Sequence, residues 1–307
     1  MESNRKEDSM RTDIAFKTTD GTTLRGWHFA PNSPGPHPTI VMAHGFSAVK
    51  EMYLDAYAEV FAQAGFASVV YDNRGFGASD GAPRQEIDPW LQVRDYSDAI
   101  TFARGLEHTD PRRIGIWGSS YSGGHVLVVG ATDRRVRCVV AQVPQISGWQ
   151  GLRRLVRADF IGMLEGQFAA ERNARAAGGS PAMIPVVAAD PMGPSALPTA
   201  DAWRWFSETA AARAPSWRNE VTVRSIEYAF GYEPGAYVGL VSPTPLLLIV
   251  ATGDHVTASD LAIAAYERAL EPKRLTLLQG GHFDAYGAAF GRSSSAAVEW
   301  FRAHLGH

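Results

Sequence analysis

The chain has 307 residues, of which 45% are hydrophobic and 20% charged, an ordinary composition for a globular protein with a sizeable core. Its net charge of -3 gives no electrostatic reason to bind nucleic acid or an acidic membrane surface. The single cysteine, Cys138, excludes an internal disulfide, and its place in the apolar run from Val136 to Val140 predicts a buried thiol.

The first ten residues are charged and contain no apolar segment of the kind found in a secretory signal. No apolar run is long enough to cross a membrane. We therefore expect a cytoplasmic protein that begins with a flexible tail over residues 1–10. Its expected partner is a small-molecule substrate, with no nucleic acid and no membrane; the sequence leaves a homodimer open.

The first elements alternate between strand and helix patterns. Residues 11–30 alternate around the turn 19–22, as a hairpin does. The runs 39–43 and 66–71 are almost continuously apolar, which is typical of strands covered on both faces, and helical spacing of apolar residues over 53–64 lies between them.

A second helix is predicted over residues 90–106, followed by a strand ending near Trp117 and another over 135–143. Three charged side chains are expected on the wetter side of that helix: Arg94, Asp95 and Asp98. Strands that alternate with helices predict the α/β class, with a mostly parallel central sheet and helices on both faces.

The alternation stops near Pro144 and resumes with a strand over 245–250, followed by a helix, a strand and a closing helix. Between these points lie helical pieces, many alanines and four tryptophans. We therefore expect a core formed by residues 11–146 and 243–307, with a mainly helical cap over 147–242.

The stretch from Arg113 to Gly124 reads as a short strand that turns sharply into a helix. Ser120 lies at the turn, between the small residues Gly118 and Ser122, as the nucleophile does in a G-x-S-x-G elbow. The turn is so tight that larger flanking side chains would collide. Ser122 departs from the glycine of that motif but is small, and Ser119 is excluded because the residue two positions before it is Trp117.

A serine hydroxyl needs a histidine to accept its proton and a carboxylate to orient that histidine. Asp254 and His282 each follow a late predicted strand, and the order Ser120, Asp254, His282 is that of the α/β-hydrolase fold. Asp260 is the alternative acid, although its position resembles the first turn of a helix. The alternative histidines are less well placed: His44, His125 and His255.

Acyl chemistry also needs two N–H groups to hold an oxyanion, for which we expect the backbone N–H groups of Tyr121 and Phe46. Six aromatic residues of the cap are expected to line the substrate pocket: Trp203, Trp205, Phe206, Tyr228, Phe230 and Tyr232. The glycines of Gly75 to Gly81 do not have the spacing of a dinucleotide site, and no residues have the spacing of a zinc site, so we expect no cofactor and no metal.

Five motifs together resemble the α/β-hydrolase superfamily: H-G-F at 44–46, D-N-R-G-F-G-A-S-D-G at 72–81, G-S-S-Y-S-G at 118–123, G-D at 253–254 and G-G-H-F at 280–283. The Ser-Tyr pair of the elbow resembles the dienelactone-hydrolase-like and Xaa-Pro dipeptidyl-peptidase-like esterase branch. This resemblance implies a mostly parallel sheet and a cap inserted after the strand that follows the nucleophile helix.

The leading functional hypothesis is a serine hydrolase that cleaves a carboxylic ester with an apolar acyl or aryl group through an acyl-enzyme. A C–C bond hydrolase, or an acyltransferase or thioesterase acting on a polyketide-like substrate, is the alternative within the same fold. A catalytically silent small-molecule-binding domain is the alternative from another class.

Overall fold

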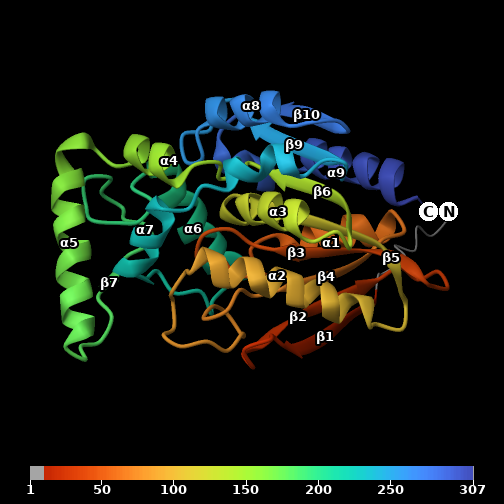
Figure 1. Ribbon diagram of the computed structural model, residues 1–307, viewed down its shortest axis with the longest axis horizontal. Helices are drawn as coiled ribbons and strands as arrows, with labels where there is room; N and C mark the ends of the chain where they lie inside the picture. The colour runs from red at the N-terminus through yellow and green to blue at the C-terminus, as the bar shows by residue number, and fades with distance from the viewer. Residues whose placement is uncertain (1–9, 307) are drawn as a thin grey trace.

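The computed structural model describes residues 10–306, so positions 1–9 of the expected flexible tail lie outside the described residues. One sheet has the strand order β1-β2-β4-β3-β5-β6-β9-β10 (Figure 1). Its strands are β1 Met10–Lys17, β2 Thr23–Ala30, β3 His37–Ala43, β4 Ala67–Tyr71, β5 Thr109–Ser119, β6 Val136–Gln142, β9 Leu246–Ala251 and β10 Lys273–Leu278. The hairpin strand β2 is antiparallel to β1 and β4, and the strands from β4 to β10 are parallel, so the expected α/β fold is confirmed.

Helices cover both faces of this sheet (Figure 1). They are α1 Leu54–Gln63 and α9 Phe290–Leu305 on one face, and α2 Pro89–Arg104, α3 Tyr121–Thr132 and α8 Ser259–Arg268 on the other. The strands supply both faces in alternation: Val41 of β3 packs on the α2/α3 side, whereas Ile40 and Met42 pack on the α1/α9 side. This two-sided burial explains the continuous apolar runs 40–43 in β3 and 246–251 in β9.

The expectation for Asp95 in α2 was wrong. Its side chain is buried and accepts two hydrogen bonds from the Arg74 guanidinium, at 2.7 Å from Nε and 2.5 Å from Nη2. Arg94 is exposed and Asp98 half-buried. The spacing of charged residues along a helix does not reveal a partner outside the helix. Here the partner, Arg74 in the loop before α2, makes burial of the carboxylate tolerable.

The segment between β6 and β9 contains four α-helices: α4 Gly148–Leu155, α5 Ala158–Ala176, α6 Ala200–Arg213 and α7 Val223–Phe230. They gather at one end of the sheet, together with the short antiparallel pair β7 Met183–Ile184 and β8 Val221–Thr222 (Figure 1). The 3₁₀ helix η1 Pro234–Leu240, at the end of the expected cap, packs against α3 and α8 of the core.

The chain enters and leaves this group of helices at adjacent points. The Gly148 N–H donates to the Tyr232 carbonyl at 2.8 Å, and the Gly235 N–H donates to the Ile146 carbonyl at 2.8 Å. A Cβ on Gly148 would lie 1.7 Å from the Ala229 carbonyl oxygen, so only glycine permits this approach. The two crossings, at which the chain passes from the sheet domain to these helices and back, are therefore hydrogen-bonded to each other.

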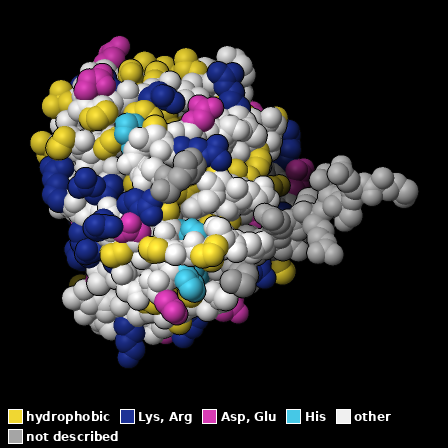
Figure 2. Space-filling view, turned by 90° about the vertical axis from the view of Figure 1, so that its right-hand side faces the viewer, with side chains coloured by type: hydrophobic (Ala, Val, Ile, Leu, Met, Phe, Trp, Pro, Cys, Tyr) yellow, Lys and Arg dark blue, Asp and Glu magenta, His cyan; other side chains and the backbone are white. Residues whose placement is uncertain are grey.

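Figure 2 shows the end of the molecule opposite these helices, where Lys and Arg side chains gather on one side of the face. The start of β5 carries an Arg113–Asp110 ion pair at 2.8 Å, and the turn before β6 carries an Arg135–Asp133 pair at 2.5 Å.

Within residues 10–306, no helix combines the length and hydropathy required to span a bilayer.

Candidate active site

The site lies where the strand order reverses. From β3 the chain passes through α1 to β4 on one side, then through α2 to β5 on the other side of β3. The chain leaves β3 toward one face of the sheet and leaves β5 toward the other, which opens a crevice at the carboxyl edge, where open α/β sheets bind ligands. The loop after β3, residues 44–53, and the turn after β5 start side by side at this crevice.

Ser120 occupies the turn between β5 and α3 with φ 60° and ψ -120°, a strained conformation for a residue other than glycine. Its N–H donates to the Gln142 carbonyl at 2.9 Å, which fixes the turn against β6. A Cβ on Gly118 would lie 2.2 Å from the Ser122 carbonyl oxygen, so this position requires glycine. Ser122, which replaces the last glycine of the motif, is buried within the first turn of α3.

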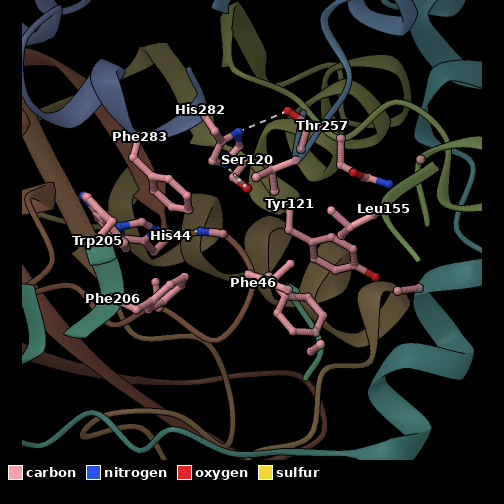
Figure 3. Close-up of a pocket in the computed structure, with 18 of the residues that line it drawn as sticks. His44, Phe46, Ser120, Tyr121, Leu155, Trp205, Phe206, Thr257, His282 and Phe283 are labelled. Atoms are coloured by element: carbon pink, nitrogen blue, oxygen red, sulfur yellow. Dashed lines mark hydrogen bonds between the residues drawn. The ribbon is translucent and has the colours of Figure 1, made fainter. Parts of the chain in front are cut away.

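The structure brings Ser120, His282 and Asp254 together in one hydrogen-bonded chain. Figure 3 shows the Ser120–His282 end of this chain. The His282 Nδ1–H donates to Asp254 Oδ2 at 2.7 Å, which leaves Nε2 as the acceptor for the Ser120 hydroxyl at 3.0 Å. His282 opens the 3₁₀ helix η2 His282–Tyr286 after β10, and Asp254 follows β9. Both side chains are buried.

The Asp254 carboxylate is held from several directions. The Val256 and Thr257 N–H groups donate to Oδ1 at 2.8 and 2.9 Å, and the Thr257 hydroxyl lies 2.9 Å from Oδ2. Burial opposes ionisation, but the charge of His282 and the hydrogen bonds from His282 and Thr257 outweigh it and hold the pKa of Asp254 below its usual value. The carboxylate is therefore ionised and fixed beside the imidazole.

The alternative residues lie elsewhere. Asp260 is exposed in the first turn of α8 and pairs with Arg154 at 2.7 Å. His255 is exposed. His125 is buried under the elbow, where its Nε2 lies 2.9 Å from the Gln92 amide oxygen.

The loop 44–53 lies directly against the nucleophile. A Cβ on Gly45 would lie 2.7 Å from the Ser120 Cβ, so glycine allows this contact. Tyr121 is the first residue of α3, and its N–H therefore has no intrahelical acceptor. Among the described residues the Phe46 N–H likewise donates to no protein group. Both donors flank Ser120 and are available to a ligand.

Three buried side chains hold this loop in place: His44, Asn73 and Asp72, of which the last two had not been assigned to the site from the sequence. His44 accepts the Gly45 N–H on Nδ1 and bonds the Met52 carbonyl through Nε2 at 2.8 Å, and burial lowers its pKa to about 4, so it is neutral. The Asn73 amide donates to the His44 carbonyl at 3.0 Å. Asp72 accepts from the Lys50 N–H and from its ammonium, both at 2.8 Å. The Asp72-Asn73 pair at the start of the motif at 72–81 is the sequence feature that could have identified these two residues.

An apolar cavity extends from Ser120 and His282, and two of the six expected aromatic residues, Trp205 and Phe206, line it (Figure 3). Further apolar lining residues are Phe46, Leu152, Leu155, Ala196, Leu197, Ile226, Ala229, Val256, Phe283 and Tyr286. Leu152 and Leu155, like Ile226 and Ala229, have the i, i+3 spacing that puts two side chains on one helix face, a signal that could have identified them.

The other four expected pocket residues do not line the cavity, so that part of the prediction was wrong. Tyr232 is buried beneath the elbow with its hydroxyl 2.8 Å from His125 Nδ1. Phe230 packs edge-on against Phe168, and Tyr228 lies under the Arg224 guanidinium. The fourth is Trp203, which lies two positions before Trp205, about 200° around the same helix.

The fold and the strand-end site place the protein among the α/β-hydrolases. The chain matches the X-Pro dipeptidyl-peptidase (S15) family over residues 20–284 and belongs to that family. It is 32% identical over 288 residues to a thiohydrolase of Eupenicillium brefeldianum, covering 92% of this chain and 91% of the relative. It is 30% identical over 275 residues to the polyketide transferase grgF of a Penicillium species, covering 89% and 90%.

The crystal structure of the α/β-hydrolase GrgF from Penicillium sp. sh18 superposes with a TM-score of 0.85 at 26% identity, covering 97% of this chain and all of GrgF. The family, fold and relatives establish the chain as a hydrolytic enzyme of the α/β-hydrolase fold. Within residues 10–306, no group of three or more His, Cys, Asp or Glu side chains is placed to hold a metal ion.

Proposed function

We propose that the protein cleaves esters of apolar carboxylic acids through an acyl-enzyme formed on Ser120. The observation that carries this proposal is the continuous hydrogen-bonded chain from the Ser120 hydroxyl through His282 to the buried Asp254, at 3.0 and 2.7 Å. A silent binding domain would not need a strained serine aligned with a fixed imidazole.

In this mechanism the Ser120 oxygen attacks the ester carbonyl carbon while His282 Nε2 takes its proton. The carbonyl oxygen becomes an oxyanion, which the N–H groups of Phe46 and Tyr121 stabilise. As the intermediate collapses, the bond to the alcohol oxygen breaks and His282 returns the proton to it. Water, deprotonated by the same imidazole, then attacks the acyl-enzyme and releases the acid. Asp254 holds the tautomer and stabilises the imidazolium.

The cavity favours an apolar acyl or aryl group, because Phe46, Trp205, Phe206 and Phe283 surround the approach to Ser120. Such a lining also keeps water away from the acyl-enzyme, which favours a second candidate: transfer of the acyl group to another nucleophile. The names of the thiohydrolase and polyketide transferase relatives support thioester donors and acyl transfer alongside ester hydrolysis.

Covalent labelling with a fluorophosphonate, combined with hydrolysis of p-nitrophenyl esters of graded chain length, tests the proposal. Ser120→Ala should abolish labelling and lower kcat/KM by at least about 10³-fold, because no nucleophile remains. Ser122→Ala is the matched control, since it removes a buried hydroxyl two residues away that neither lines the cavity nor bonds His282. Labelling that persists in Ser120→Ala would contradict the scheme.

Product analysis separates the candidates. Ester or thioester hydrolysis releases an acid with an alcohol or thiol, whereas acyl transfer consumes an added acceptor and forms a new ester. Cleavage of a C–C bond would instead release an acid with a ketone.

A further inference from the structure

Four residues that line the cavity have a hydroxyl group, and one of these hydroxyl groups lacks a hydrogen-bond partner. The four residues are Ser120, Tyr121, Thr257 and Tyr286. Ser120 bonds His282, Thr257 lies within 2.9 Å of Asp254, and the Tyr286 hydroxyl is 2.5 Å from the Ser119 hydroxyl. The Tyr121 hydroxyl is buried and has no hydrogen-bond partner among the described residues.

The ring of Tyr121 is fixed, so this hydroxyl cannot reach solvent by a simple rotation. Phe46 and His125 pack against the ring edge-to-face, with centroids 5.6 and 5.1 Å away, and Tyr232 packs at 5.4 Å. Burial raises the pKa of Tyr121 well above its usual value, so the group stays a protonated donor. A buried donor without an acceptor is unfavourable, and at a cavity wall a bound ligand can supply the missing acceptor.

The position of the ring indicates which part of a substrate would meet this donor. In Figure 3 the Tyr121 ring and the His282 imidazole lie on opposite sides of Ser120, and the Tyr121 hydroxyl is on the side of its ring that faces away from Ser120. Leu155 lines the same cavity. Because His282 protonates the leaving alcohol in the proposed mechanism, the alcohol must lie on the imidazole side. The acyl chain is then the part that extends past Tyr121.

We propose that the Tyr121 hydroxyl is a specificity-determining hydrogen-bond donor, and that the substrate's acyl chain carries an oxygen acceptor remote from the scissile carbonyl. This inference rests on the proposed acyl-enzyme function. The preferred acyl group is then mainly apolar, to match the surrounding Leu152, Leu155, Ile226 and Ala229, with a hydroxyl or carbonyl oxygen at one position along the chain.

A set of p-nitrophenyl esters tests the inference: the octanoate and its hydroxy derivatives, with the hydroxyl moved one carbon at a time. For one position, wild-type kcat/KM should exceed that for the octanoate by at least about tenfold. Tyr121→Phe should reduce this ratio to about one, because only the hydroxyl is lost. Tyr232→Phe is the matched control: it removes a neighbouring buried hydroxyl that bonds His125 and does not line the cavity, so the ratio should persist.

Stability gives a second measurement. Tyr121→Phe should leave the thermal midpoint unchanged or raised, because it removes an unpaired buried group, whereas Tyr232→Phe should lower it by breaking a hydrogen bond. A lower midpoint for Tyr121→Phe would show that the hydroxyl is already paired in the free protein. That result, or the same substrate ratio in Tyr121→Phe and wild type, would overturn the inference.

Calorimetry separates this inference from the proposed function. The Ser120→Ala variant should bind the preferred hydroxyoctanoic acid more tightly than octanoic acid, and adding Tyr121→Phe should remove the difference. If esters are hydrolysed without any preference, the role of the Tyr121 hydroxyl fails and the acyl-enzyme proposal stands. If no ester is hydrolysed but the binding preference is present, the acyl-enzyme proposal fails instead.

Discussion

The indole Nε1 of Trp217 donates a hydrogen bond of 3.1 Å to the Ser47 carbonyl, which joins the inserted helical segment to the loop after β3. Ser47 has a positive φ of 57°, and it adjoins Phe46, a proposed oxyanion donor. The Trp217 ring also stacks on Phe206, with centroids 5.1 Å apart, and Phe206 lines the cavity. One side chain therefore contacts both the substrate wall and the loop that carries the donor.

Trp217→Phe should lower kcat by about tenfold with little change in KM. The phenyl ring keeps the stack on Phe206 but lacks the N–H that holds the Ser47 carbonyl, so the oxyanion donor loses its fixed position. Affinity for a trifluoromethyl ketone, which mimics the tetrahedral intermediate, should fall in parallel with kcat. Trp203→Phe is the control, because Trp203 does not line the cavity; equal losses in both variants would contradict a role in positioning.

Lys50→Met should destabilise the fold by about 3 kcal/mol, because it leaves the buried Asp72 carboxylate without its cation. The change also removes the contact between the ammonium and the Trp27 ring at 4.7 Å. Adding Asp72→Asn should restore part of the loss, since the uncompensated charge is then gone. Urea unfolding followed by tryptophan fluorescence measures both changes, and additive losses in the double variant would argue against coupling.

Thr257→Val should lower kcat/KM about tenfold, whereas Thr257→Ser should retain most of the activity. The hydroxyl lies 2.9 Å from Asp254 Oδ2 and 3.0 Å from the Val143 carbonyl, so it fixes the carboxylate that orients His282. Valine keeps the volume and loses the bond, while serine keeps the bond. Steady-state kinetics with a p-nitrophenyl ester provides the measurement, and equal activity of the two variants would show that volume alone matters.

The free energy of unfolding should fall as the pH decreases from 6.5 toward 4. Burial lowers the pKa of His125 from 6.5 to about 3, so in this range the unfolded chain binds a proton that the folded chain does not. Each such histidine contributes a slope of up to about 1.4 kcal/mol per pH unit, and stability is lost toward acid. In the folded state His125 Nε2–H donates to Gln92 while Nδ1 accepts from Tyr232, which suits the neutral ring.

His125→Gln removes this titration, so the slope of stability against pH should be shallower by about 1.4 kcal/mol per pH unit between pH 6 and 4. Urea unfolding at several pH values gives the two slopes. Parallel slopes for the variant and the wild type would mean that His125 binds its proton equally well in both states.

The sheet could be predicted from the sequence because strands buried on both faces carry continuous apolar runs, as 40–43 and 246–250 do. The grouping of Ser120, Asp254 and His282 was predictable for a related reason. Parallel strands end at one edge of the sheet, so polar residues that follow three of them must lie near one another. The order of these residues along the chain then left few alternatives for the nucleophile, the acid and the base.

The cavity wall was not predictable in the same way. Which residues of α6 and α7 face Ser120 depends on how each helix is rotated against the core, and aromatic content alone does not determine that rotation. Trp205 and Trp203 have the same chemistry, yet only Trp205 lines the cavity. Asp95 was misplaced because its partner, Arg74, lies 21 residues earlier in the loop before α2, beyond the reach of helical periodicity.

The paired crossings at Gly148 and Gly235 bring the two ends of the α4–α7 segment together on the sheet domain. A segment whose ends are neighbours can be lengthened, replaced or grafted from a relative while the strands below keep their register. Chimeras in which the segment between these two glycines is exchanged for that of a relative should therefore acquire the relative's substrate preference. The incoming segment must supply a hydrogen-bond donor for the Ser47 carbonyl, as Trp217 does here. Diversification within the family would then need little change to the catalytic platform.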